Sequence, residues 1–193
     1  MFNDRYGLTD AVIEGRKIMT RRMINLNSTS DVQVRIFAGY VQIIGGSGNV
    51  CAEKKLPYKV GEVVAVAQSY EQAYCQGNMD ADDAIIRGLK YDPGMSNKMY
   101  VRADLMPHQI RITGIRCERL QDISDAECMK EGVRVEFAKN GRLMYYYFDI
   151  KRWREVWFDT PREAFSALID KVSGRGTWDR NPWVVAYEFE LVK

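Results

Sequence analysis

The spacing of apolar and polar positions predicts a short helix near the start of the chain. Apolar residues recur at helical spacing over 8–12, and Thr9 or Asp10 is placed to cap the run. Gly15 follows the last apolar position, where a glycine commonly ends a helix. The pattern therefore predicts a helix of about two turns that stops at Gly15.

Alternating or β-branched runs predict most of the remaining structure as strands. They lie at 32–36, 40–44, 63–67, 98–103, 108–120, 142–148 and 185–191. The run at 108–120 keeps its alternation only if Thr113-Gly114 forms a bulge. Bulged strands are how small barrels turn corners, so this position favours a curved sheet.

Two further helices have strong start signals. Ser124-Asp125-Ala126-Glu127 is a capping box, and it should open a short helix that ends at Gly132. Thr160-Pro161-Arg162-Glu163 combines a cap, a proline at the first helical position and a glutamate at the third. The apolar face that follows runs to Gly174. A single helical turn is also expected near 82–89.

These elements predict one α+β domain over residues 1–193. Five or six strands with about three short helices indicate a small, mostly antiparallel barrel with helices packed on it. The sequence has no repeats and no linker long enough to separate two domains. We expect insertions near 23–56, 71–97 and 133–153, with a hairpin in the first that is closed by the glycine-rich 45–49 and an aromatic hairpin in the third.

Composition limits the function classes. Hydrophobic residues make up 46% and charged residues 28% of the chain, which is ordinary for a globular protein. The net charge of +2 does not favour nucleic acid, so any such partner must be bound by a local patch. Four scattered cysteines and a single histidine argue against a zinc site, and we expect no metal or other cofactor.

Hydropathy gives no sign of a membrane or secretory protein. The N-terminus has no apolar run typical of a signal peptide. The longest apolar run, Val63 to Ala67, is far too short to span a bilayer. We therefore expect a cytoplasmic protein with reduced thiols and no membrane partner.

The segment from Gly15 to Arg22 holds the densest cluster of candidate chemistry. Four of its eight residues are cationic, and Thr20 follows Lys17 by three positions. A cationic turn after a helix is either an anion-binding site or a solvated basic edge, and the residues alone leave both open. In a straight strand Lys17 and Thr20 would point to opposite faces, so their convergence requires Lys17 to lie in the turn.

This segment and several later ones resemble a known family. Gly15-x-Lys17-x-x-Thr20-x-Arg22 resembles the signature of the ASCH domain, a branch of the PUA-like β-barrel superfamily. Val60-Gly61-Glu62 and the helix that ends in Lys130-Glu131-Gly132 fit the order of the same family. Met106-Pro107, the run 117–124 and Trp178-x-x-Asn181-Pro182-Trp183-Val184 resemble ASCH proteins of phages and prophages. The resemblance spans about 1–22, 57–70, 99–132 and 160–192.

The chain departs from that family's pattern at two places. It has Ala67-Gln68 where phage relatives usually have an Arg-Glu pair. It has His108-Gln109 where they often have Arg-Trp after Met-Pro. Both departures concern the expected ligand pocket rather than the barrel.

The resemblance implies a PUA-like barrel that binds RNA or a modified base. Some small ASCH proteins are amidohydrolases that remove an acyl group from the exocyclic amine of a modified cytidine with a Lys, a Thr and a Glu. On this chain those roles correspond to Lys17, Thr20 and Glu131. The implied binding residues are Gly15, Arg21, Arg22, Gln68, Asn181 and Trp183.

The chemistry of these residue types is consistent with such a role. Threonine is a poor nucleophile until a base takes its proton, and a desolvated lysine can be that base. A nearby carboxylate such as Glu131 can carry the proton to the leaving amine. Glu131 would also end its helix, where carbonyl dipoles favour a compensating cation such as Lys17 or Arg22.

Three functions remain open at this point. The chain is a binder of RNA, a nucleotide or a modified nucleobase; an amidohydrolase acting on N4-acylated cytidine-like substrates; or a phage accessory protein that binds an unknown protein partner through 142–148. Structural interpretations compete at individual residues. Trp178 and Trp183 are expected to pack in the core, and Asn181-Pro182 is expected to form a turn.

Overall fold

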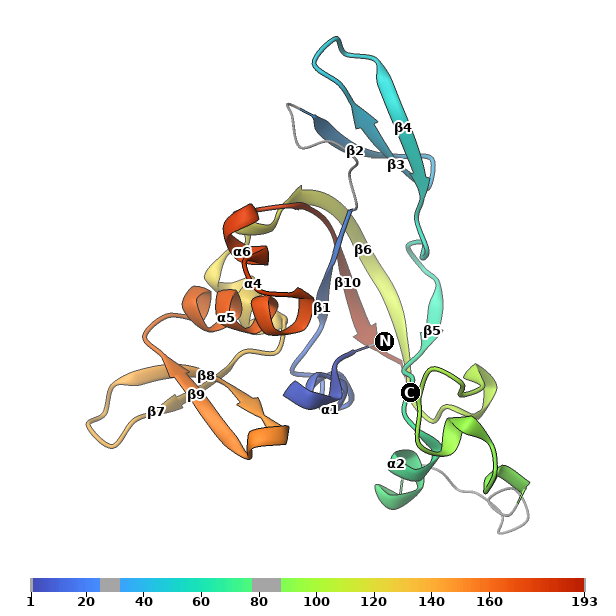
Figure 1. The fold of residues 1–193 in the computed structure, drawn as a ribbon, viewed down its shortest axis with the longest axis vertical. Helices are drawn as coiled ribbons and strands as arrows, with labels where there is room; N and C mark the ends of the chain where they lie inside the picture. The colour runs from blue at the N-terminus through green and yellow to red at the C-terminus, as the bar shows by residue number, and fades with distance from the viewer. Residues whose placement is uncertain (1, 25–31, 78–87, 193) are drawn as a thin grey trace.

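The computed structural model describes residues 2–24, 32–77 and 88–192, which form an α+β fold of antiparallel sheets (Figure 1). The central sheet has four strands in the order β1-β10-β6-β5. Their bounds are Met19–Met23 for β1, Trp183–Leu191 for β10, Gln109–Arg119 for β6 and Val63–Ala65 for β5. The long strands β6 and β10 curve together into a half-barrel, which confirms the predicted small barrel with flanking helices.

The bulge predicted at Thr113-Gly114 lies within this curved pair. β10 pairs with β6 in continuous register up to Glu188, which lies opposite Gly114. The next residue, Phe189, lies opposite Ile112, so Thr113 is the extra residue on β6. Because a bulge adds a bend and local twist, it helps β6 to curve around the core.

The main core covers one face of this sheet. Val185, Tyr187 and Phe189 of β10 are buried there, as the alternation of the closing strand predicts. Ile110 and Ile112 of β6 join them. Burying each of these large side chains contributes roughly 1.5–3 kcal/mol, so this face is the main source of stability for the sheet.

Short helices flank the sheet. The described residues form α1 (Leu8–Ile13), α2 (Tyr70–Cys75), α4 (Asp125–Lys130), α5 (Pro161–Ser173) and α6 (Thr177–Arg180). They also form 3-10 helices at Asp4–Tyr6, Pro93–Met95, Ala103–Leu105, Leu120–Asp122 and Ile150–Arg152. None of the helices in these ranges is long and apolar enough to cross a bilayer.

Capping hydrogen bonds define where α4 and α5, the two helices beside the site, begin. At α4 the Ser124 hydroxyl accepts a hydrogen bond from the Glu127 amide at 3.3 Å, and the Glu127 carboxylate accepts one from the Ser124 amide at 3.0 Å. Thr160 and Glu163 form the same reciprocal box at α5. Both predicted starts are confirmed, and Gly132 follows α4 with a positive φ of 104°.

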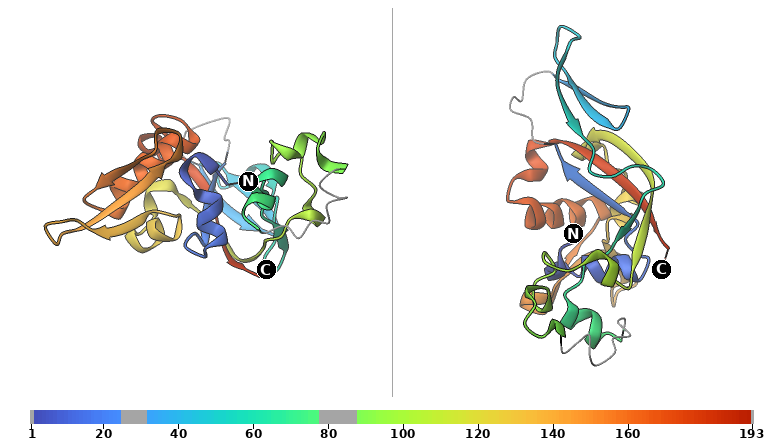
Figure 2. Two further views of the ribbon diagram at one scale, coloured as in Figure 1. Left: turned by 90° about the horizontal axis from the view of Figure 1, so that it is seen from below. Right: turned by 90° about the vertical axis from the view of Figure 1, so that its right-hand side faces the viewer.

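Two smaller sheets lie outside the half-barrel. One contains β2 (Gln33–Phe37), β3 (Tyr40–Ile44) and β4 (Val50–Lys55), and the other contains β7 (Arg134–Phe137), β8 (Leu143–Asp149) and β9 (Arg154–Phe158). The first projects beyond one end of the central sheet, and the second lies against α5 (Figures 1 and 2). Both predicted hairpins are therefore present. Each of the two sheets also has a third strand that the sequence did not predict.

Two local predictions are wrong. The run 98–103 is not a strand, because its backbone turns, with the Tyr100 amide donating to the Asn97 carbonyl at 3.1 Å, and then enters the 3-10 helix at Ala103–Leu105. The cap of α1 is Gly7 rather than Thr9 or Asp10. Most of the helical turn expected near 82–89 lies outside the described residues.

Candidate functional site

Lys17 lies in the turn between α1 and β1, before the strand begins. Its amide donates to the Ala11 carbonyl at 2.8 Å, and the Ile18 amide donates to the Lys130 carbonyl at 3.0 Å. The turn is therefore tied both to α1 and to the end of α4. This is the placement that convergence of Lys17 with Thr20 requires.

The Lys17 ammonium reaches the end of α4. Nζ donates to Glu131 Oε2 at 2.6 Å, to the Glu131 carbonyl at 2.8 Å and to the Met19 carbonyl at 2.7 Å. Lys17 is 2% exposed and Glu131 is 5% exposed. Since an ammonium has three donors, all of its hydrogen bonds are satisfied inside the protein.

Burial and charge act in opposite directions on this ammonium. Burial lowers the pKa of Lys17, and the neighbouring Glu131 carboxylate partly offsets that effect. The accepting Glu131 carbonyl lies at the C-terminal end of α4, where a positive charge is favoured. The site therefore holds a desolvated lysine against a carboxylate that stabilises its charged form.

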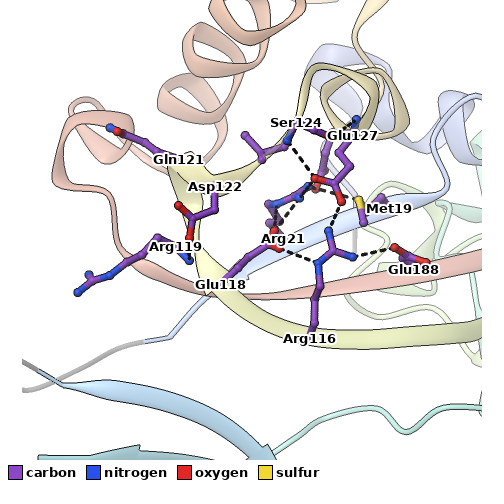
Figure 3. Close-up of polar contacts among 12 residues, drawn as sticks. Met19, Arg21, Arg116, Glu118, Arg119, Gln121, Asp122, Ser124, Glu127 and Glu188 are labelled. Atoms are coloured by element: carbon purple, nitrogen blue, oxygen red, sulfur yellow. Dashed lines mark hydrogen bonds and ion pairs between the residues drawn. The ribbon is translucent and has the colours of Figure 1, made fainter.

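Arg21 holds the other oxygen of the same carboxylate. Its side chain has no exposed surface, and Nη1 lies 3.0 Å from Glu131 Oε1. Nε donates to Glu118 at 2.8 Å, and Nη2 donates to Glu127 at 3.1 Å. Figure 3 shows Arg21 between the sheet and α4. Glu131 is thus fixed at both oxygens, by Lys17 and by Arg21.

Arg116 extends this network across the sheet (Figure 3). Arg21 and Arg116 lie opposite the same residue of β10, so their side chains share one face. Arg116 donates to Glu118 at 2.6 Å and to Glu188 at 2.7 Å, and it also pairs with Glu127. These contacts connect α4 to β1, β6 and β10.

The network stabilises the charged form of Glu127. Partial burial opposes ionisation of this carboxyl group. The hydrogen bond from the Ser124 amide and the charges of Arg116 and Arg21 outweigh burial, and together they lower the pKa of Glu127. Glu127, which completes the capping box of α4, is therefore also part of the ion-pair network.

A cavity of about 290 Å³ opens beside the Lys17–Glu131 pair. Its polar wall includes the three predicted catalytic residues and two predicted binding residues: Lys17, Thr20, Glu131, Arg21 and Arg22. Its apolar wall consists mainly of one face of α5 with two N-terminal residues: Phe165, Leu168, Ile169, Val172, Phe2 and Leu8. Segments far apart in the sequence therefore meet around one small space.

Thr20 lies on the opposite face of β1 from Arg21. In register it faces Tyr187 of β10, and Arg22 faces Val185. Because β1 is an edge strand, the cavity receives residues from both of its faces. Within the described ranges no hydrogen bond joins the Thr20 hydroxyl to Lys17, although both residues line the cavity.

Two predicted binding residues, Gly15 and Gln68, lie outside this cavity. Gly15 occupies the exposed turn after α1 with φ of 72°, a conformation that suits glycine. Gln68 is fully buried, and its amide donates to Gln76 at 2.8 Å. Neither residue lines the cavity beside Lys17.

Asn181 and Trp183 also lie outside that cavity. Asn181 adopts a positive φ of 43°, and its side-chain oxygen accepts from the Gln121 amide at 2.8 Å, which confirms the expected turn. The Trp183 ring lies 4.7 Å from the Arg119 guanidinium and packs against the main core. Both residues hold β10 in place beside the end of β6.

The sequence did not identify Glu118, Glu127 or Arg116 as part of the site. Arg116 and Glu118 are two positions apart in a strand, so they share a face, and this spacing was the available signal. Glu127 was recognised only as a capping residue. The sequence does not show which face of the strands packs against α4, because that depends on the tertiary packing.

Other candidate chemistry is sparse. Cys51, Cys75, Cys117 and Cys128 are all free thiols. The described ranges contain no group of three or more His, Cys, Asp or Glu residues arranged to hold a metal ion. The cavity beside Lys17 is therefore the site with the strongest combination of enclosure, charge and hydrogen-bonding groups.

Comparison of the chain with protein-family models, with curated proteins and with solved structures gave no match in any of the three.

Proposed function

We propose that this chain is an ASCH-type PUA-like domain whose cavity binds a nucleotide, a nucleoside or a modified nucleobase of RNA. The observation that carries the proposal is the direct contact of Lys17 with Glu131 beside a cavity that Thr20 and Arg22 also line. These are the positions that the ASCH resemblance assigns to the ligand site.

The size of the cavity supports a small ligand. Sites for small molecules commonly measure about 300–1,000 Å³. At about 290 Å³ the cavity is at the lower end, which suits one nucleoside better than a longer stretch of RNA. In an RNA ligand, a single unstacked nucleotide would enter it.

The lining supports the same class of ligand. The apolar side chains of α5 complement the apolar surface of a nucleoside, and the polar wall offers hydrogen bonds to its polar groups. Arg22 is exposed at the cavity and can pair with a phosphate. Because the net charge is only +2, this local cation accounts for phosphate binding better than the overall charge does.

Calorimetric titration with cytidine, N4-acetylcytidine and cytidine monophosphate tests the proposal. Val172→Trp places a large ring at the cavity wall and is expected to abolish binding. Lys171→Trp adds the same ring at the neighbouring exposed position of α5 and should leave binding intact. Equal affinity in both variants, or no binding by the unaltered protein, would overturn the proposal.

A second candidate is hydrolysis of an N4-acylated cytidine-like amide. The specific observation in its favour is the Thr20 hydroxyl, which has no hydrogen-bond partner among the described residues and lines the same cavity as Lys17 and Glu131. In such a reaction Thr20 attacks the acyl carbon, its proton passes to a base, and the amine leaves with a proton. Water then cleaves the acyl-threonine ester and releases the acid.

Lys17 must lose a proton before it can act as that base. All three of its N–H groups are engaged as donors, and the nearest acceptor for a proton is Glu131 Oε2 at 2.6 Å. Burial favours this loss because it lowers the pKa of Lys17. Release of acetate from N4-acetylcytidine, abolished in Thr20→Val and Lys17→Met, supports hydrolysis. No turnover across acylated nucleosides leaves binding as the function.

A further inference from the structure

A second, smaller cavity adjoins the one beside Lys17. It measures about 140 Å³ and shares Phe2, Thr20 and Arg22 with the first cavity. Its other walls come from the inner face of the half-barrel: Tyr58, Val64, Ala65, Ala67, Ile110, Ile112, Tyr187 and Phe189. The two cavities therefore meet at Thr20, one with a charged wall and the other mostly apolar.

Tyr187, in the wall of the smaller cavity, carries a polar group that is unpaired in the described part of the fold. Tyr187 is 1% exposed, and its hydroxyl has no hydrogen-bond partner among the described residues. Its ring packs edge-on against Tyr58 with ring centres 5.7 Å apart. Buried polar groups are nearly always paired, so an unpaired hydroxyl beside a cavity is a candidate to bind a ligand.

Tyr187 lines the smaller cavity together with two of the groups that influence its hydroxyl. Burial raises the pKa of Tyr187 to about 12, Tyr58 adds to this effect, and Arg22 opposes it. Tyr58 and Arg22 both line the same cavity. Tyr187 therefore belongs to the same cavity wall as Tyr58 and Arg22.

We infer that the smaller cavity receives the planar ring of the ligand and that the Tyr187 hydroxyl binds a polar atom on the edge of that ring. This inference rests on the proposed function and narrows the ligand to a heteroaromatic ring with a polar substituent. Phe2 and Tyr58 provide aromatic contacts, and Val64 and Ile110 provide apolar contacts. The substituent passes Thr20 toward Lys17.

The first test compares Tyr187→Phe with the unaltered protein. The variant is expected to bind cytidine about three- to tenfold more weakly, because it loses one hydrogen bond. Its Tm is expected to be equal or higher, because the ligand-free protein no longer buries an unpaired hydroxyl. Tyr147→Phe removes a buried hydroxyl in a different core cluster and should leave affinity unchanged.

The second test separates the two cavities with free bases. Cytosine, uracil and adenine carry the ring without the sugar, and Ala67→Leu fills the smaller cavity only. Base binding that is lost in Ala67→Leu supports the inference, even if nucleosides do not bind and the proposed function fails. Cytidine binding that is unchanged in Ala67→Leu and Tyr187→Phe overturns the inference and leaves the proposed function standing. No binding of any base or nucleoside overturns both.

Discussion

Lys17 Nζ lies 2.6 Å from Glu131 Oε2, although 114 positions separate the two residues in the sequence. The pair joins the turn before β1 to the end of α4, and Arg21 holds the second oxygen of the same carboxylate. The cavity beside them is bounded by α5. The geometry of the site therefore depends on how α4 and α5 pack against the edge of the half-barrel.

Removing either partner of the buried pair should destabilise the fold. We expect Lys17→Met to lower the free energy of unfolding by about 3 kcal/mol, since an unpaired buried charge is costly. Glu131→Leu should cost more, because it leaves both Lys17 and Arg21 without this carboxylate. Urea unfolding measures both values.

The double variant Lys17→Met/Glu131→Leu provides the control for that prediction. It removes both charges of the pair, so it should be more stable than Glu131→Leu alone. Purely additive losses would show that the two side chains do not interact in solution.

Glu127 should make stability depend on pH in the acid range. Its folded-state pKa lies below 4.5, so its contribution is present above pH 4.5 and is lost as the pH falls through the lowered value. Glu127→Gln should therefore flatten the decline in stability below pH 4.5. Glu136→Gln, at an exposed position of β7, should leave the decline unchanged. A decline of the same slope in Glu127→Gln would contradict this role.

Arg22 should contribute to the salt dependence of nucleic-acid binding. If an oligonucleotide places a phosphate at Arg22, Arg22→Ala should reduce the slope of log affinity against log salt by about one unit. Arg142 is a matched exposed arginine just before β8, where it pairs with Asp159. Arg142→Ala should not change the slope. An unchanged slope in both variants would show that no phosphate binds at Arg22.

The four thiols should fall into two reactivity classes. Cys51 and Cys75 are exposed and should react readily with a thiol reagent in the native protein. Burial raises the pKa of Cys117 to about 11 and that of Cys128 to about 12, so both should react slowly. The time course of dithionitrobenzoate labelling distinguishes them. Fast labelling of four thiols under native conditions would contradict the described packing.

Local signals predicted the frame of the site well. The capping boxes at Ser124 and Thr160 depend only on neighbouring residues, so α4 and α5 begin where the sequence indicates. The bulge at Thr113 followed from a phase change within one strand. The juxtaposition of Lys17 with Glu131 came only with the family resemblance, because no local pattern encodes a contact across 114 positions.

The missed elements have no such local signal. All six residues of β4 are exposed, so this strand has no alternation of buried and exposed positions to identify it. The burial of Arg21 depends on α4 packing over β1 and β6, because α4 and its end supply Glu127 and Glu131 while β6 supplies Glu118. From the sequence alone, Arg21 looks like any other residue of a basic cluster.

A crystal structure of the protein grown with N4-acetylcytidine would show whether the cavity beside Lys17 is the ligand site. We expect the nucleoside in the space between Lys17 and α5, in contact with Thr20 and Arg22, with the Lys17–Glu131 pair intact. A ligand bound elsewhere on the molecule, or a Lys17 side chain turned away from Glu131, would contradict it.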